Sequence, residues 1–283
     1  MSDGVHTDGT GGSGGGGGAC DPGFVLPSAA AQAMAASESW RVFRIMAEFV
    51  TGFETMARLP PAVTIFGSAR TPTDHPDYTQ AEELARRLGA KGLAIITGGG
   101  PGVMEAANKG AKAAGACSVG LNIALPHEQK PNPFQTHELL FEYFFVRKVM
   151  FMKYARAFVI FPGGFGTLDE FFESLTLIQT LKIEPFPVVL VGSAFWSGLL
   201  DWMREALAER WQTIGVSDLD LFRVTDDIGE VVSIVERSLR GEAMVPGQET
   251  TIPGHAGELT GEGTRAGINP RAPLLHDPDR PEV

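Results

Sequence analysis

The feature that most constrains the fold is an alternation of short β-branched runs with longer amphipathic segments between residues 38 and 242. Short apolar runs bounded by Gly and Pro are typical of buried strands, whereas amphipathic segments of about ten residues or more are typical of helices. Strands that alternate with helices in this way predict a parallel sheet covered by crossover helices. We therefore expect an α/β fold: an open parallel sheet with helices on both faces, in a single domain.

The same patterns predict the individual elements. Strands are expected at 63–66, 93–97, 118–121, 157–161 and 188–191, with weaker candidates at 140–145 and 222–224. Helices are expected at about 39–58, 78–88, 103–114, 146–155, 167–181, 195–212 and 226–239. The first helix carries an apolar stripe, which predicts contact with the core or with another subunit. Its members are Trp40, Phe43, Phe49, Val50, Phe53 and Met56.

The two ends of the chain differ in composition from this central part. Residues 1–37 contain a near-continuous glycine run from Gly9 to Gly18, and residues 243–283 are dominated by Pro, Gly, Thr and acidic residues. Such segments bury too little apolar surface to offset the entropy lost on ordering. We predict a disordered Gly-rich tail over 1–37, a folded domain over 38–242, and a disordered acidic tail over 243–283.

Charge and hydropathy exclude several partners. The 34 acidic and 23 basic residues give a net charge of -11, which argues against nucleic acid or an anionic membrane as the main partner. The longest uncharged apolar stretch, 185–200, is shorter than the roughly 20 residues of a membrane span. The start lacks the features of a secretory signal, and Cys20 and Cys117 cannot build a disulfide framework. We expect a cytoplasmic protein.

Three predicted strands end in small residues, where open parallel sheets bind ligands. The first turn offers the hydroxyl of Ser68. The second, Gly98, Gly99 and Gly100, opens a helix whose first N–H groups lack helical partners and attract anions. Its spacing is not that of a dinucleotide fingerprint. Glu105, in the first turn of that helix, suits either a site role or a favourable interaction with the helix dipole.

The third turn carries the most information. After Phe161 the chain reads Pro-Gly-Gly-Phe-Gly-Thr-Leu-Asp-Glu, ending at Glu170. The residues suited to wrap a phosphate are Gly163, Gly164, Gly166 and Thr167. An acidic pair so close to a phosphate would repel it, so Glu170 should face another part of the ligand, such as sugar hydroxyls or a cationic transition state. The alternative is that Asp169 and Glu170 only complement the helix dipole.

Two adjacent cations, Arg147 and Lys148, interrupt an apolar segment upstream of this turn. Neighbouring helix residues point about 100° apart, so at least one of the two should face the sheet edge and not open solvent. An arginine there suits bidentate contact with a phosphate, a carboxylate or a purine edge. The alternative is a pair of solvated surface cations.

The turn Gly98–Gly100, the pair Arg147 and Lys148, and the Pro-Gly-Gly-x-Gly-Thr-x-x-Glu element together resemble the LOG ("lonely guy") family of cytokinin riboside 5'-monophosphate phosphoribohydrolases. This family was long mislabelled as lysine decarboxylases, and the likeness, to its longer bacterial branch, spans about residues 62–239. It implies a Rossmann-like homodimer or higher homo-oligomer. It also implies hydrolysis of the N-glycosidic bond of cytokinin riboside 5'-monophosphates or AMP, without metal or cofactor.

The resemblance also assigns roles to residues. Arg147 and Glu170 match the family's catalytic arginine and glutamate. The positions that match substrate contacts are Lys148, the loop 163–167, Glu128 and Thr176. Phe165 and Asp169 stand where plant members commonly have Tyr and Glu, which bears on base preference.

Two other functions compete with this one. A pyridoxal-phosphate decarboxylase needs a Schiff-base lysine with an acidic partner for the cofactor, and neither Lys148 nor Lys153 has that context. A non-catalytic carrier or sensor, of the molybdenum-cofactor carrier type, would hold a phosphorylated ligand without cleaving it. The intact Arg147 and Glu170 favour the enzyme. The histidines show no metal-ligand spacing, so no metal site is expected.

Overall fold

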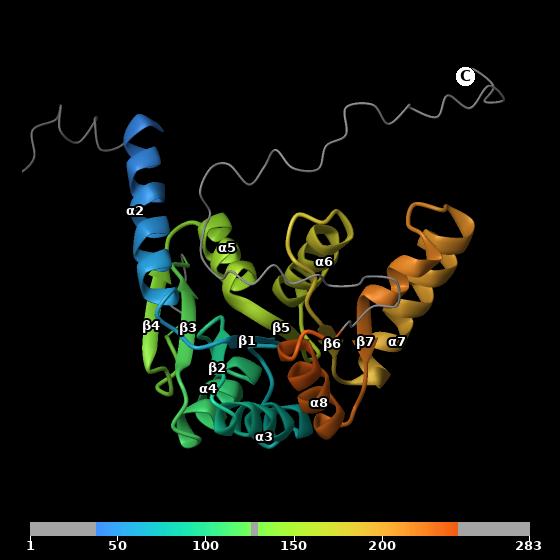
Figure 1. The fold of residues 1–283 in the computed structure, drawn as a ribbon, viewed down its shortest axis with the longest axis horizontal. Helices are drawn as coiled ribbons and strands as arrows, with labels where there is room; N and C mark the ends of the chain where they lie inside the picture. The colour runs from blue at the N-terminus through green and yellow to red at the C-terminus, as the bar shows by residue number, and fades with distance from the viewer. Residues whose placement is uncertain (1–37, 126–129, 243–283) are drawn as a thin grey trace, which may run out of the picture.

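A computed structural model describes residues 38–125 and 130–242 of the chain, and its core is one parallel sheet (Figure 1). Seven strands lie in the order β4-β3-β2-β1-β5-β6-β7, and each neighbouring pair is parallel. The strands are β1 Ala62–Phe66, β2 Ala94–Thr97, β3 Ser118–Ile123, β4 His137–Phe141, β5 Ala155–Ile160, β6 Val188–Leu190 and β7 Phe222–Val224. The predicted α/β class and parallel sheet are confirmed.

Helices cover both faces of the sheet. The α-helices are α2 Glu38–Met56, α3 Pro76–Ala90, α4 Val103–Ala113, α5 Phe144–Tyr154, α6 Phe165–Gln179, α7 Ser193–Trp202 and α8 Ile228–Leu239. A π-helix, Met203–Arg210, continues α7, and a 3-10 helix, Val216–Leu221, precedes β7. The residues of α3, α4 and α8 share one hydrophobic cluster, and those of α2, α5, α6 and α7 share the other.

The central strand β1 shows why the sheet needs two helical layers. All five of its residues are buried, so it has no solvent-facing side. Val63 and Ile65 belong to the cluster with α3, α4 and α8, whereas Ala62 and Phe66 belong to the cluster with α5 and α6. A continuous apolar run is the pattern expected of a parallel strand that is covered on both faces.

The chain reverses direction across the sheet between β1 and β5. From β1 it winds outward through β2 and β3 to β4, and from β5 it winds outward the other way to β6 and β7. The connection after β1 therefore leads to α3 on one face, while the connection after β5 leads to α6 on the opposite face. Ligands of open α/β sheets bind in the crevice at such a switch point.

Two predicted elements differ from the structure. The weak strand candidate at 140–145 lies at His137–Phe141, because the Glu48 carboxylate accepts the backbone N–H groups of Glu142 and Tyr143 at 2.8 and 3.3 Å and the ladder ends there. The predicted helix 195–212 begins at Ser193 and becomes π-helical from Met203. The i→i+5 bonding of a π-helix suits the buried pair Met203 and Ala208, which are five residues apart.

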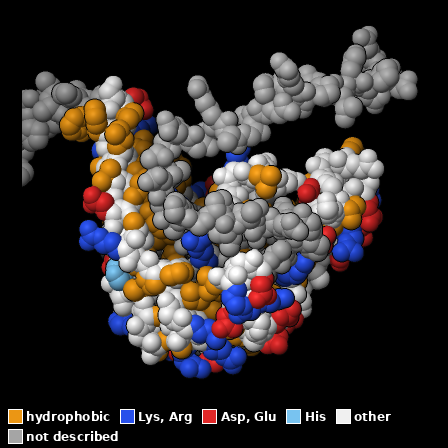
Figure 2. Space-filling model, in the orientation of Figure 1, with side chains coloured by type: hydrophobic (Ala, Val, Ile, Leu, Met, Phe, Trp, Pro, Cys, Tyr) orange, Lys and Arg blue, Asp and Glu red, His pale blue; other side chains and the backbone are white. Residues whose placement is uncertain are grey.

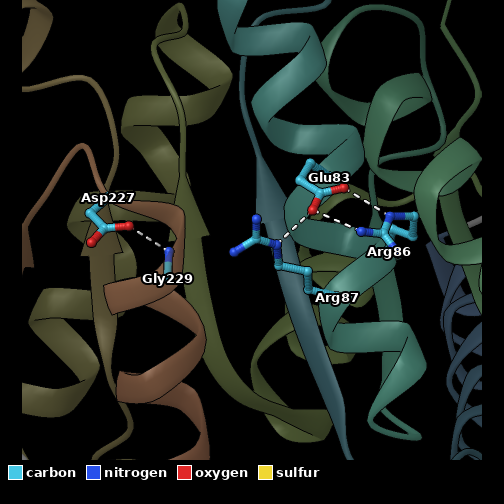
Figure 3. Close-up of polar contacts among 5 residues, drawn as sticks. All are labelled: Glu83, Arg86, Arg87, Asp227 and Gly229. Carbon is cyan, nitrogen blue, oxygen red and sulfur yellow. Dashed lines mark hydrogen bonds and ion pairs between the residues drawn. The ribbon is translucent and has the colours of Figure 1, made fainter.

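Side-chain hydrogen bonds cap the start of α8 and link neighbouring residues on the surface of α3 (Figure 3). Asp227 caps α8 by accepting the backbone N–H of Gly229 at 2.7 Å. On α3, Glu83 accepts from Arg86 at 2.8 Å and from Arg87 at 2.6 Å. These hydrogen bonds hold the pKa of Glu83 at about 2. The cluster is solvated, so its contribution to stability is small.

The apolar stripe predicted on the first helix divides into two parts. Phe49, Phe53 and Met56 pack on the cluster with α5 and α6. Phe43 is 60% exposed and Val50 is 53% exposed. Hydrophobic side chains accordingly gather on the outside of α2 in the space-filling view (Figure 2).

No helix among residues 38–125 and 130–242 is long and apolar enough to cross a membrane. The predicted disorder of 1–37 and 243–283 concerns residues outside the described ranges.

Candidate active site

The three small-residue turns meet at the carboxyl edge of the sheet. The Ser68 N–H donates to the carbonyl of Pro162 at 2.9 Å, which joins the turns after β1 and β5. The Val103 N–H donates to the carbonyl of Ser68 at 3.1 Å, which joins the turns after β1 and β2. A cavity of about 510 Å³ opens here, and Ser68 and Gly163 are among its lining residues. The structure thus brings the three predicted turns together.

The turn after β5 combines a packed glycine with two open ones. A Cβ on Gly163 would stand 2.1 Å from the Thr167 hydroxyl, so a side chain cannot be accommodated there. A Cβ on Gly164 or Gly166 would meet nothing within 4 Å. Helix α6 begins at Phe165, two residues before the predicted start, and Phe165 itself is 92% exposed. The first turn of α6 therefore presents its N–H groups beside open space, which suits an anion.

Arg147 turns toward the glycine turn after β2. Its Nη2 lies 3.4 Å from the point where a Cβ on Gly98 would stand. The guanidinium stacks over the rings of Phe151 and Phe144, at 5.1 and 5.7 Å from their centroids. Its Nε is buried and has no hydrogen-bond partner in the described part of the chain. The prediction that one cation of the pair faces the sheet edge is confirmed, and the alternative of two solvated cations is wrong.

Glu170 lies on α6 and is 4% exposed. Its Oε2 is buried without a partner among the described residues. Burial raises the pKa of Glu170 to about 7, against the opposing charges of Lys148 and Arg147 and with the support of Glu173 and Asp169. An acid this deeply buried is not a surface residue that complements a helix dipole. A carboxyl with a pKa near neutrality is suited to exchange a proton with a ligand.

The charges of Arg147 and Glu170 lie near enough that each shifts the pKa of the other. Burial lowers the pKa of the Arg147 guanidinium, and Glu170 and Asp169 oppose that effect. Buried polar atoms are nearly always hydrogen-bonded, and leaving a charged one unpaired is costly. The unpaired Nε of Arg147 and Oε2 of Glu170 are therefore the donor and acceptor that a bound polar ligand would meet.

Lys148 lies between α5 and α6, where its ammonium bonds Asp169 at 2.8 Å and Glu173 at 2.7 Å. Burial lowers its pKa, but these two carboxylates outweigh burial and the pKa of Lys148 is raised. The sequence predicts Lys148 as a substrate contact, whereas its hydrogen bonds here go to α6. The structure thus shows it as the cation that joins the two helices carrying Arg147 and Glu170.

Two predicted contacts, Glu105 and Thr176, bond other parts of the molecule. Glu105 accepts the Tyr78 hydroxyl at 3.1 Å, between α3 and α4 on the face away from Arg147. Thr176 is exposed and donates to the Phe172 carbonyl at 2.8 Å, further along α6. Six residues of helix separate it from Glu170, or about 9 Å along the axis. Glu128 lies outside the described residues.

The structure reveals residues near the glycine turn that the sequence analysis missed. Polar side chains support Gly98–Gly100 from the α4 side: the buried Thr97, Asn108, Asn122 and Asn132, and the half-buried Gln135. Glu173, the second carboxylate on Lys148, was also missed. One signal in the sequence could have indicated these supporting residues. Thr97 and Asn122 are polar residues at the ends of otherwise apolar predicted strands.

Several known proteins resemble this chain in sequence. Residues 104–235 match the family model described as "Possible lysine decarboxylase". The chain is 29% identical over 177 residues to the pyrimidine/purine nucleotide 5'-monophosphate nucleosidase of Escherichia coli, covering 58% of this chain and 38% of that protein. It thus spans well under half the length of this relative.

Shorter relatives are covered more completely. The chain is 31% identical over 162 residues to the cytokinin riboside 5'-monophosphate phosphoribohydrolase of Rhodococcoides fascians, covering 54% of this chain and 79% of that protein. Among solved structures, the molybdenum cofactor carrier protein of Chlamydomonas reinhardtii has a TM-score of 0.46 at 22% identity, over 64% of this chain and 98% of that one. The chain matches the Rhodococcoides protein over most of that protein's length, and the family model matches the helices that carry the site. The chain therefore belongs to the LOG family.

Proposed function

We propose that the protein hydrolyses the N-glycosidic bond of a nucleoside 5'-monophosphate, AMP or a cytokinin riboside 5'-monophosphate, to free base and ribose 5-phosphate. The observation that carries this proposal is the buried Arg147 and Glu170 pair, whose Nε and Oε2 lack partners among the described residues. The pair lies beside the glycine turns that suit an anion. The names of the relatives in Escherichia coli and Rhodococcoides fascians support the same reaction class.

The chemistry divides between these two side chains. As the bond between C1' and the base nitrogen breaks, positive charge develops at the ribose, and the Glu170 carboxylate stabilises it. Glu170 also accepts a proton from the attacking water, whose oxygen bonds to C1', while the leaving base takes a proton from solvent and Glu170 later returns its own to solvent. A pKa of about 7 leaves a large ionised fraction of Glu170 at neutral pH. Arg147 supplies positive charge to the phosphate or to the leaving base.

The phosphate is assigned to the turn after β5, which hydrogen bonds through Ser68 join to the turn after β2. Gly164 and Gly166 border open space, and Thr167 lies at the start of α6. Ser68 and the turn Gly98–Gly100 complete the substrate contacts. Lys148 acts through its bonds to Asp169 and Glu173, by holding α5 and α6 together. The contacts of Glu128 and Thr176 stay predictions of the family resemblance, and a site role for Glu105 stays a prediction from its place in the first turn of α4.

The lysines of the chain do not favour an amino-acid decarboxylase, in spite of the description of the family model. A Schiff base forms from an unprotonated amine. The carboxylates of Asp169 and Glu173 raise the pKa of Lys148 and hold it charged. Lys153 is exposed and lies over the rings of Phe53 and Tyr154. Neither lysine is set up to form an aldimine.

The decisive experiment is incubation of the full chain with AMP and with other nucleoside monophosphates, followed by chromatography of the released base. We expect Glu170→Gln to lower turnover on the order of 100- to 1000-fold, because it removes the charge that stabilises the transition state. Glu83→Gln is the matched control, since its carboxyl bonds Arg86 and Arg87 on the solvated surface of α3. Near-normal turnover by Glu170→Gln would refute the assignment, and a nucleotide bound tightly but recovered whole would make the protein a carrier.

We further propose that the protein is a cytoplasmic homodimer or higher homo-oligomer whose catalytic domain spans 38–242. Exposed apolar side chains on neighbouring helices support self-association. On α2 these are Trp40, Val42, Phe43, Met46 and Val50, and on α5 they are Phe144, Phe145 and Val149. Helices α2 and α5 are in contact, so the two sets lie on adjacent surfaces.

A further inference from the structure

The carbonyl of Gly99 accepts three hydrogen bonds, all from one segment of the chain. The backbone N–H and the Nδ2 of Asn132 donate to it at 2.9 and 3.1 Å. The Nε2 of Gln135 donates to it at 2.9 Å. The Nδ2 of Asn132 also donates to the carbonyl of Gly100 at 3.0 Å. The carbonyls of Gly99 and Gly100 are thus both directed to residues 132–135.

This arrangement is anchored in the interior. Asn132 is 6% exposed, and its Nδ2 donates to the Oδ1 of Asn108 at 2.8 Å. Asn108 is fully buried on α4, and its Oδ1 also accepts the Thr97 hydroxyl at 2.7 Å. Gly99 has a φ of 75°, and a Cβ there would stand 2.1 Å from the Oδ1 of Asn122. The turn is therefore held in one conformation by buried amides and by the lack of a side chain.

The direction of the carbonyls determines the direction of an N–H group. In a planar trans peptide the C=O of one residue and the N–H of the next point in opposite directions. The Gly99 carbonyl faces the side of α4, so the N–H of Gly100 points away from it. That direction is away from residues 132–135. The Nη2 of Arg147 also lies beside this turn, 3.4 Å from the point where a Cβ on Gly98 would stand. Three donors on the carbonyl also polarise the peptide and strengthen its N–H as a donor.

The N–H of Gly100 has no acceptor among the described residues, although Gly100 is buried. Buried backbone N–H groups are almost always satisfied, so an oriented one without a partner indicates a ligand. We propose that the Gly100 N–H binds a phosphate oxygen of the nucleotide, and that Asn132 and Gln135 are positioning residues that aim it. The inference rests on the proposed function for the identity of the ligand.

The test uses calorimetric binding of two probes, ribose 5-phosphate and adenine, to the full chain. We expect Asn132→Ala and Gln135→Ala each to weaken binding of ribose 5-phosphate about 10-fold, the size of a lost hydrogen bond to a charged group. Binding of adenine should stay within about 2-fold, because adenine has no phosphate. Gln135 is only half-buried, so Gln135→Ala serves if Asn132→Ala does not fold.

The matched control is Thr136→Val. The Thr136 hydroxyl bonds the backbone of Ser118 at 2.9 and 3.0 Å, so the variant loses bonds in the same segment without touching the glycine turn. We expect it to bind both probes as the unmodified chain does. Unchanged binding of ribose 5-phosphate by both alanine variants, or equal weakening of both probes, would overturn the inference. Failure of the unmodified chain to bind ribose 5-phosphate would overturn it too, whereas failure to release base from AMP would count only against the proposed hydrolysis.

Discussion

At the scale of single residues, the chemistry depends on Glu170 being an acid in an apolar place. Its neighbours on α6 in the sheet-facing cluster are Phe171 and Leu175, both buried. Burial is the largest cause of its raised pKa, and the nearby cations reduce that effect without cancelling it. The side chain thus destabilises the folded protein when it ionises, which is a cost that a structural residue would not carry.

This cost predicts a pH dependence of stability. The pKa of Glu170 rises from 4.5 to about 7 on folding, so the folded state binds the proton more tightly and loses stability as the pH rises through that range. Glu170→Gln removes the effect. We expect the variant to gain on the order of 3 kcal/mol relative to the unmodified chain between pH 4.5 and 8. Urea unfolding at the two pH values measures the gain, and a difference independent of pH would contradict it.

Two neighbouring glycines should respond differently to alanine. A methyl group on Gly163 meets the Thr167 hydroxyl, whereas one on Gly164 meets nothing. We expect Gly163→Ala to lower the free energy of unfolding by about 1 to 3 kcal/mol, the usual cost of overpacking. Gly164→Ala should stay within about 0.5 kcal/mol, as surface changes do. Equal losses in urea unfolding would mean that the turn after β5 is not packed as described.

At the scale of elements, the site is a pair of helices joined by one cation. Helix α5 contributes Arg147 and α6 contributes Glu170, and Lys148 of α5 bonds Asp169 and Glu173 of α6. The ammonium is only 18% exposed, so solvent screens these bonds less than those of a surface pair. The same charge lowers the pKa of Glu170.

Removing that cation should therefore move the pH optimum. In Lys148→Met the pKa of Glu170 loses a lowering influence and rises, so the ionised base appears at higher pH. We expect the acid limb of the kcat/KM profile for AMP to move up by about one pH unit. Lys153→Met is the control from the same helix, since Lys153 lies over Phe53 and Tyr154 and not beside Glu170. An unmoved limb in Lys148→Met would show that the cation does not act on Glu170.

At the scale of the whole molecule, α2 is a helix whose apolar surface is only partly buried by the rest of the chain. One side packs on the sheet-facing cluster through Phe49 and Phe53, and the other exposes Phe43 and Val50 (Figures 1 and 2). An amphipathic helix gains most of its stability by burying its apolar face. A second copy of the chain would cover the exposed part.

A charged residue introduced on the exposed side of α2 should therefore dissociate the proposed homo-oligomer. We expect Phe43→Asp to shift the full chain to a smaller species in sedimentation analysis, because an unpaired carboxylate would be buried in the interface. Val216→Asp is the control, since Val216 is equally apolar and 70% exposed on the 3-10 helix before β7. A mass unchanged in Phe43→Asp would mean that α2 is not the contact between copies.

The sequence alone determined the α/β class, most strand positions and the three small-residue turns, and it singled out Arg147 and Glu170 as candidates. These are properties of local pattern: a period of hydrophobicity, a glycine where a turn is needed, a cation in an apolar segment. The strand at His137–Phe141 was misplaced because a distant carboxylate, that of Glu48, ends it. No pattern within residues 137–145 contains that information.

Only the tertiary structure decided what each polar residue of the site contacts. It separated Arg147 from its neighbour Lys148, which bonds α6, and it placed Glu105 against Tyr78 on the other face. It also brought Asn132 under Gly99, more than thirty residues away in the chain. The physical reason is that burial, pKa and hydrogen bonding depend on neighbours in space, and those neighbours come from segments that the sequence order keeps apart.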